Sequence, residues 1–283
     1  ILADIRGSLE RIAVFYDQWY SQASIEESGA IAATIEVMRS RGLVYEKDGA
    51  TWLASTQLGD TRDRVLIKSD GDPTYLAGDI AYHRDKFLVR GFDEVVDVFG
   101  ADHHGHVASL KSGVAALGVD PDRLHIEIGQ MVSLVGRIAG ESAGTGPIKL
   151  SKRAGNIVRL DELVADIGAD ALRLLSLSAS IDQPTTLDLE AVRVQSMENP
   201  VYYVQYAFAR IHSIGRVAAE RGLVRRDVAE IDVSRLAEPR ELALLRQIEQ
   251  LPEVLELACL SRAPHKIATW VRELAGCFHG FYH

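Results

Sequence analysis

The sequence predicts an α/β fold with a parallel sheet, followed by an all-helical segment. Two apolar runs, EVVDVFG and HIEIGQMVSLV, are typical of buried strands, and residues Val107 to Leu117 between them show the apolar period of a helix. Strands that alternate with helices in this way usually pair in parallel. From about Leu187 onward the pattern is helical and rich in tyrosine, which predicts a second, all-α domain.

The chain divides into three parts by pattern. Residues 1–70 begin with helical stretches and continue with short strand-like runs, and we assign them as a connecting part of the first domain. Residues 71–186 contain the strand–helix alternation, and residues 187–283 form the helical domain. We place the boundary between the last two where Pro184 and Thr186 interrupt the pattern.

Composition restricts the class of protein. Of the 283 residues 47% are hydrophobic and 25% are charged, which predicts a globular core. No apolar run reaches the roughly 18 residues that a membrane span needs, and the first residues do not resemble a signal peptide, so we expect a cytoplasmic protein without membrane contact. Cys259 and Cys277 lie far apart without metal-ligand spacing, in keeping with a reducing compartment.

Charge and chain ends lead to two further expectations. A net charge of −9 argues against indiscriminate nucleic-acid binding, although Arg221, Arg225 and Arg226 could form a local basic patch. The chain lacks an initial methionine and begins within a helical pattern. We therefore expect a truncated chain.

A helix is expected from about Pro73 to Phe87, with Asp72 as its N-cap. Leu76, Ile80 and Phe87 would line its apolar face. Its second face would carry Tyr75, Asp79, Tyr82, His83 and Lys86. On that face an aspartate could bind a guanidinium through both oxygens while a tyrosine stacks on it. An exposed polar stripe without function is the alternative.

A polar cluster follows the first predicted strand, where Asp102 and three histidines occur in the run ADHHGH. In open parallel sheets the ligand crevice lies at the carboxyl ends of the strands, so these side chains are well placed to meet substrate. A metal site is one alternative. Histidines that only hold neighbouring loops are another.

Two more motifs carry charge or aromatic surface. In KLSKRAGN, two lysines and an arginine could close on a polyphosphate and stabilise a leaving pyrophosphate, while a solvated basic loop is the alternative. In NPVYYVQYAFAR, three tyrosines and Arg210 could stack on nucleotides. Packing between domains is the alternative that we favour for the tyrosines, because aromatic residues at helical spacing mostly fill cores.

Taken together, these motifs resemble the arginyl-tRNA synthetases, a family of class I aminoacyl-tRNA synthetases. The segments SDGDPTYLAGDIAYHRDK, VFGADHHGHV, IGQMV, IKLSKRAGN and ENPVYYVQYAFARIHSI occur in the order that the family has them. The resemblance covers nearly the whole chain. It implies the second half of a class I Rossmann-like nucleotide-binding domain, followed by a helical-bundle anticodon-binding domain.

The resemblance also implies site residues. Tyr75 and Asp79 match the pair that reads the arginine guanidinium, and His103 falls near that pocket. Tyr206 and Arg210 are the implied tRNA contacts. ATP is implied to meet His106, the strand Gln130, Met131 and Val132, and the mobile loop residues Lys149, Ser151 and Lys152, which are also the implied catalytic residues. Within that loop Leu150 stands where methionine is common.

The implied reaction is the ATP-dependent activation of L-arginine to arginyl-adenylate and its transfer to tRNA(Arg). Mg²⁺ would enter with ATP, no structural metal is implied, and we expect a monomer. The family has a His-x-Gly-His motif on the first helix after its first strand, upstream of these segments, and here the only residues with that spacing, His103 to His106, belong to the ADHHGH run. The family also continues past the final FHGFYH. We therefore expect the fragment alone to be inactive.

Three other functions are weighed against this one. A cysteinyl or glutamyl synthetase is the nearest, and the Tyr75–Asp79 pair and the lack of zinc-like cysteines argue against the cysteinyl type. A non-catalytic tRNA-binding module is the second, and the lysine loop argues against it. A metal-dependent hydrolase built on the histidine cluster is the third.

Overall fold

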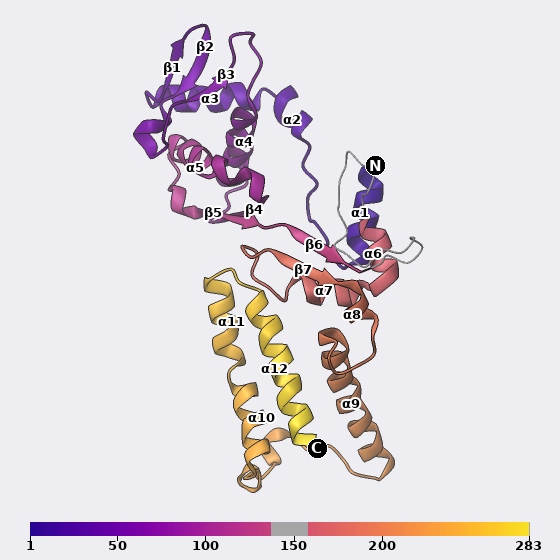
Figure 1. Ribbon diagram of the computed structural model, residues 1–283. Coiled ribbons are helices and arrows are strands. Elements are labelled where there is room, and N and C mark those ends of the chain that lie inside the picture. Colours follow the sequence, from indigo (N-terminus) through magenta and orange to yellow (C-terminus); the bar gives the residue numbers. More distant parts are fainter. Residues whose placement is uncertain (137–157, 283) are drawn as a thin grey trace. The chain divides into compact units, whose positions relative to one another are not determined.

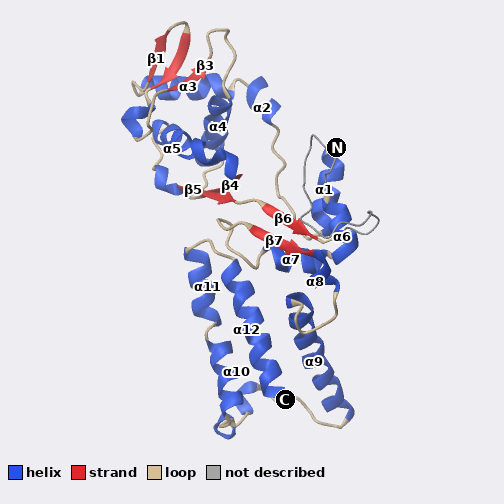
Figure 2. Ribbon diagram, viewed as in Figure 1, coloured by secondary structure: helices blue, strands red, loops and turns tan. Residues whose placement is uncertain are grey.

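The computed structural model describes residues 1–136 and 158–282. The chain forms two compact units, of which one is Tyr16–Met131 and the other combines Ile1–Phe15 with Val132–His283 (Figure 1). Each unit contains both helices and strands (Figure 2). The predicted α/β class is confirmed, and the last part of the chain is helical as expected.

The unit Tyr16–Met131 contains two small sheets. Strands β1, β2 and β3 form an antiparallel sheet, and β4 pairs in parallel with β5 from Val95–Leu124 to Gly100–Gly129. The parallel pairing predicted for the two apolar runs is therefore confirmed. The elements of this unit are α2 (Gln22–Glu27), α3 (Ala30–Ser40), β1 (Val44–Lys47), β2 (Ala50–Leu53), η1 (Ser55–Leu58), β3 (Arg64–Ile67), α4 (Tyr75–Arg84), η2 (Asp85–Val89), β4 (Val95–Gly100), η3 (Ala101–His106), α5 (Val107–Ala116), η4 (Pro121–Arg123) and β5 (Leu124–Gly129).

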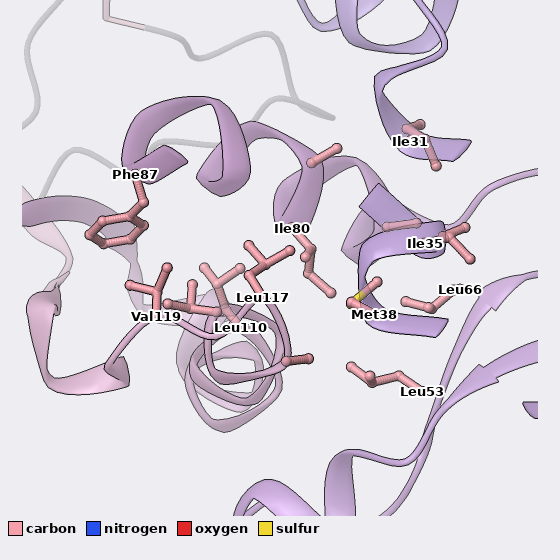
Figure 3. Close-up of a cluster of buried hydrophobic side chains, with 14 of the residues drawn as sticks. Ile31, Ile35, Met38, Leu53, Leu66, Ile80, Phe87, Leu110, Leu117 and Val119 are labelled. Atoms are coloured by element: carbon pink, nitrogen blue, oxygen red, sulfur yellow. The ribbon is translucent and has the colours of Figure 1, made fainter. Parts of the chain in front are cut away.

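One apolar core joins the helices of this unit to its strands (Figure 3). Met38 of α3, Leu53 of β2 and Ile80 of α4 are completely buried there. Helices α4 and α5 approach closely at Gly113, where an added Cβ would stand 2.4 Å from Cγ1 of Ile80. The core therefore fixes α4 from both sides, and α4 is the helix that carries the candidate arginine-binding residues.

Helix α4 begins at Tyr75, two residues later than the motif suggests. Thr74, not Asp72, is the N-cap, since its hydroxyl accepts a hydrogen bond from the amide of Ala77 and donates one to the carbonyl of Val65 at 2.9 Å. Its last turn widens into the π-helical turn η2. The predicted apolar face is confirmed at Ile80, which is buried.

His83 departs from the predicted polar face of this helix. Its side chain is buried, whereas Tyr75 on the same predicted face is 85% exposed. The reason is a buried aspartate, Asp97, in the neighbouring strand β4, to which the imidazole ring of His83 is hydrogen-bonded. A polar side chain can be buried when such a partner is present.

The second unit begins with a small α/β part. Strand β6 pairs in parallel with β7 from Val132–Thr185 to Val135–Asp188, and Leu134 and Leu187 are buried in a cluster with Leu172. The run expected as one strand is thus divided, because β5 pairs with β4 and β6 with β7. The elements are α1 (Leu2–Arg11), β6 (Val132–Val135), α6 (Leu160–Ile167), α7 (Ala169–Ser176), β7 (Thr185–Asp188) and α8 (Leu189–Arg193).

The long helix expected from about Leu187 is interrupted. Strand β7 and helix α8 come first, and α9 begins at Pro200, where Asn199 accepts hydrogen bonds from the amides of Val201 and Tyr202. Proline is well suited to the first helical position because its missing N–H has no partner there. The remaining elements are α9 (Pro200–Glu220), η6 (Val228–Glu230), η7 (Val233–Arg235), α10 (Pro239–Glu249), α11 (Leu251–Leu260) and α12 (His265–Tyr282).

Helices α9 and α12 pack around Ala207, Ala275 and Phe278. The two cysteines, Cys259 and Cys277, are both free thiols. Across residues 1–136 and 158–282, none of the helices has the length and apolarity to cross a membrane.

Candidate functional site

The candidate arginine site lies on the exposed face of α4, in the unit Tyr16–Met131. Tyr75 and Asp79 are one helical turn apart, and both are exposed. The imidazoles of His106 and His103, which follow β4, lie close enough to act electrostatically on the same carboxyl. The ring centroids of these two histidines lie 5.6 Å apart. Four residues singled out from the sequence therefore share one open surface.

The carboxyl of Asp79 experiences opposing influences. Desolvation by the surrounding protein raises its pKa, although one side of the residue is open to water. The nearby imidazoles of His83, His106 and His103 lower the pKa, and the carboxylate of Asp97 raises it. Because the net shift is upward, Asp79 would gain from a cationic partner, and a guanidinium can supply that charge with matching geometry.

A buried ionic cluster lies one helical turn along α4 from Asp79. Nε2 of His83 is 2.8 Å from Oδ2 of Asp97, and Nζ of Lys86 donates to Oδ1 of Asp97 at 2.7 Å. Nδ1 of His83 is 2.8 Å from the backbone carbonyl of Asp79. The side chains of His83 and Asp97 are 3% and 7% exposed, so this pair is shielded from solvent.

The Asp97 carboxylate is well compensated. Burial by itself raises its pKa, but the hydrogen bonds and charges of His83 and Lys86 outweigh that effect and lower the pKa overall. The Nζ of Lys86 also lies 4.4 Å from the centroid of the Tyr82 ring. Asp97 is therefore ionised and held between two donors.

Asp97 was not among the residues singled out from the sequence, and the burial of His83 was not expected. A signal for both was present, because Asp97 interrupts the apolar run EVVDVFG at the centre of a predicted strand. A carboxylate in a buried strand requires a cationic or hydrogen-bonding partner. The polar residues on the neighbouring predicted helix were the available partners.

The implied ATP-binding residues fall partly outside the described residues. Lys149, Ser151 and Lys152 lie there, so the structure says nothing about them. Gln130 and Met131 connect β5 to β6, and Met131 is 72% exposed. Val132 is the first residue of β6 and is paired with Thr185.

The implied tRNA contacts, Tyr206 and Arg210, occupy one side of α9. The guanidinium of Arg210 lies 3.9 Å from the centroid of the Tyr282 ring and 5.3 Å from that of Tyr206. Both residues line an open groove of about 670 Å³ with Tyr282 and Arg221. The aromatic rings thus pack against helix α12 while the groove leaves part of this surface accessible.

The histidine cluster shows no metal-binding arrangement. Among residues 1–136 and 158–282, no group of three or more His, Cys, Asp or Glu side chains is placed to hold a metal ion. Asp102 is 85% exposed at its side chain and lies 3.9 Å from His103. The geometry gives no support to the metal-site alternative within the part of the chain that the structure describes.

Two family models match the chain and divide it where the helical part begins. Residues 19–192 match the class I tRNA synthetase (R) catalytic domain, which accounts for more than half of the chain. The chain belongs to the arginyl class I tRNA synthetases. Residues 204–283 match the DALR anticodon-binding domain. The family expected from the motifs is confirmed, together with its two-domain composition.

Curated relatives support the same family. The arginine–tRNA ligase of Carboxydothermus hydrogenoformans is 44% identical over 281 residues, covering 99% of this chain and 49% of the relative. That of Frankia alni is 45% identical over 283 residues, covering 100% of this chain and 50% of the relative. The chain spans about half the length of the curated relatives that it matches.

Solved structures share the fold. A crystal structure of a Campylobacter jejuni protein assigned as an arginyl-tRNA synthetase has a TM-score of 0.86 at 38% identity, covering 99% of this chain and 59% of that chain. The arginyl-tRNA synthetase of Thermus thermophilus has a TM-score of 0.78 at 19% identity, covering 98% of this chain and 54% of that chain. The second likeness supports the fold alone.

Proposed function

We propose that the full-length protein containing this chain activates L-arginine with ATP and transfers it to tRNA(Arg). The observation that carries the proposal is the exposed Tyr75–Asp79 pair on α4, within the class I catalytic domain, whose carboxyl lies within electrostatic reach of His103 and His106. A cation-accepting carboxylate beside an exposed aromatic ring suits an amino acid with a planar, permanently charged side chain.

In this proposal Asp79 accepts both N–H groups of the substrate guanidinium, and Tyr75 stacks on it or hydrogen-bonds to it. His103 borders the same pocket. An amino acid without the guanidinium would leave the carboxylate unpaired, and such a loss discriminates strongly between substrates. The other class I amino acids considered, cysteine and glutamate, carry no positive side chain.

The chemistry needs little covalent participation by the protein. A carboxylate oxygen of arginine attacks the α-phosphorus of ATP and pyrophosphate leaves, and then a terminal hydroxyl of the tRNA attacks the adenylate carbonyl and AMP leaves. Positioning and charge stabilisation carry the rate. We assign ATP contacts to His106 and to Gln130, Met131 and Val132. The phosphates would meet Lys149, Ser151 and Lys152, with Mg²⁺ arriving bound to ATP.

The remaining assignments belong to the same proposal. Tyr206 and Arg210 would contact tRNA at the groove on α9. Residues 1–70 would connect to the catalytic domain, residues 71–186 would form its second half, and residues 187–283 would form the anticodon-binding part. We place the protein in the cytoplasm as a monomer.

The test is amino-acid-dependent exchange between ATP and pyrophosphate in the presence of total tRNA, using the full-length protein and each of the twenty amino acids. We expect exchange with arginine alone. Asp79→Asn should raise KM for arginine by at least 10-fold and leave KM for ATP nearly unchanged, since an amide keeps the shape but not the charge. Asp102→Asn is the matched control, because it removes an exposed carboxylate from the neighbouring element η3. Exchange with another amino acid, or equal effects of the two variants, would refute the arginine assignment.

A further inference from the structure

The buried cluster of His83, Asp97 and Lys86 has a definite protonation pattern. The carbonyl oxygen of Asp79 can only accept, so Nδ1 of His83, at 2.8 Å, carries a hydrogen. The Asp97 carboxylate, already bound by the ammonium group of Lys86, also accepts, so Nε2 of His83 carries a hydrogen too. His83 therefore satisfies both partners only as an imidazolium.

The charges of this cluster leave a surplus. Two cations, His83 and Lys86, surround the single carboxylate of Asp97. The surplus positive charge lies one helical turn along α4 from Asp79, and His83 acts electrostatically on the Asp79 carboxyl. The cluster thus favours the ionised form of a carboxylate that its surroundings partly desolvate.

The cluster also connects the two elements that carry the candidate site. His83 belongs to α4, which carries Tyr75 and Asp79, and Asp97 belongs to β4, which continues directly into η3 with His103 and His106. A side-chain hydrogen bond from His83 to the Asp79 carbonyl fixes the helical turn on which the candidate carboxylate stands. Apolar packing of α4 through Ile80 is not directional, so it would not fix the position of that turn as this hydrogen bond does.

We propose that His83, held by Asp97 and Lys86, is a positioning residue for arginine: it fixes the α4 turn of Asp79 relative to the β4–η3 segment. This inference rests on the proposed function, because it concerns the same pocket. It adds three residues that have no contact with substrate to the determinants of amino-acid binding.

The experiment is steady-state exchange kinetics on the full-length protein with His83→Gln. Glutamine keeps a neutral donor but has neither the charge nor the two fixed nitrogens of imidazole. We expect KM for arginine to rise about 10- to 100-fold, the range that follows from losing a hydrogen bond to a charged group. KM for ATP should change by less than about 2-fold, since none of the residues assigned to ATP lies on this turn of α4.

A pH profile distinguishes positioning from a general loss of structure. Arginine binding needs Asp79 ionised, and four groups act on it: His83, His103, His106 and Asp97. Removing the His83 cation lets the pKa of Asp79 rise further. On acidification, KM for arginine should therefore begin to increase at a higher pH in His83→Gln than in the unaltered protein.

A matched control uses the same substitution elsewhere in the unit. His125 of β5 is 3.1 Å from Glu94 and its side chain is 20% exposed, and neither residue belongs to α4 or η3. His125→Gln should leave both KM values and the pH profile unchanged. A lower melting temperature in His83→Gln with kinetics like those of His125→Gln would overturn the inference.

Lys86→Met is a second variant, which keeps the inference testable if His83→Gln does not fold. Lys86 reaches the surface, with 13% of its side chain exposed, and its removal leaves His83 and Asp97 paired. We expect a smaller rise in KM for arginine. The pH profile should shift in the same direction, because Asp97, which acts on Asp79, loses one of the two cations that offset its charge. An unaltered profile in Lys86→Met would contradict the charge argument.

The outcomes separate the inference from the proposed function. If the unaltered protein fails to activate arginine, the proposed function is wrong and the inference falls with it. If Asp79→Asn weakens arginine binding while His83→Gln and Lys86→Met do not, the function stands and the inference alone is refuted.

Discussion

Gly113 of α5 lies so close to α4, the helix of the candidate site, that a single added methyl group would push the two helices apart. In Gly113→Ala the new Cβ would stand 2.4 Å from Cγ1 and 2.6 Å from Cδ1 of Ile80. Carbon atoms in favourable contact lie about 3.5 to 4 Å apart, so α4 and α5 must separate by roughly 1 Å. Ile80 has no free space to turn into, since it is completely buried.

Two effects compete in this substitution. Overpacking of a buried contact costs about 1 to 3 kcal/mol. Replacing glycine inside a helix gains about 1 kcal/mol, because alanine restricts the unfolded chain. With a contact this short the cost of overpacking should lie toward the upper end of its range, and we expect a net loss of up to about 2 kcal/mol in the free energy of unfolding.

Hydrogen exchange is a suitable assay because it reports each unit separately. Amide protection in peptides from α4 and α5 should fall in Gly113→Ala, while peptides from α9 to α12 should be unaffected. Gly78→Ala in α4 is the matched control, since a Cβ there meets nothing within 4 Å. Gly78→Ala should be neutral or slightly stabilising. Equal protection in the two variants would refute the close-approach argument.

Three further predictions concern caps, charges and the groove on α9. Asn199→Asp keeps the acceptor for the first turn of α9 but loses the side-chain donors to the carbonyls of residues 192 and 194, so urea unfolding should show a loss of about 1 to 2 kcal/mol, and Asn199→Ala a larger one. Asp60 is buried in an ion pair with Arg64, whose hydrogen bond holds the pKa of Asp60 well below its usual range. Its stabilisation is therefore complete above about pH 4 and is lost as the pH falls further, and Asp60→Asn should remove that part of the pH dependence of melting. For the proposed tRNA contact, Arg210→Ala should weaken tRNA binding and reduce its salt dependence by about one ion in filter-binding assays, while Arg210→Lys should keep that salt dependence; unchanged binding by both would exclude Arg210 from the contact.

Much of the fold could be predicted because periodicity reports burial. Ile80 and Phe87 are both buried as their spacing indicates, and the two apolar runs do pair in parallel. Periodicity does not report where a run changes partners. The split at Gln130 and Met131 depends on which strand each half meets, and that is a property of tertiary structure.

Local competition explains the misplaced helix start. Asp72 and Thr74 are both good caps, and the choice falls on Thr74 because its hydroxyl also reaches the carbonyl of Val65. The hydrogen bond from Thr74 to Val65 could not be predicted from the sequence, since β3 and α4 meet only in the folded chain. For the same reason the helix expected before Pro200 gives way to β7, whose partner β6 lies some fifty residues earlier in the sequence.

The candidate site divides in the same way. Tyr75 and Asp79 could be placed on one face from their spacing, and the structure brings His103 and His106 within electrostatic reach of Asp79. Their roles in binding stay predictions. The buried His83–Asp97 pair could not be assigned from spacing alone, because a polar residue on a helix has the same pattern whether it meets water or a buried carboxylate.

The pairing of the chain's two ends in one unit has a consequence for the timing of synthesis. Helix α1 packs against α6, and Arg11 forms an ion pair with Asp161, 150 residues later in the chain. At roughly 5 to 20 residues per second, a ribosome needs about 8 to 30 seconds to make the residues between Arg11 and Asp161. Residues 16–131 need no such delay, since their core is made from contacts within that stretch. The core of the unit that carries Asp79 can therefore form before α6, the partner of α1, has been synthesised.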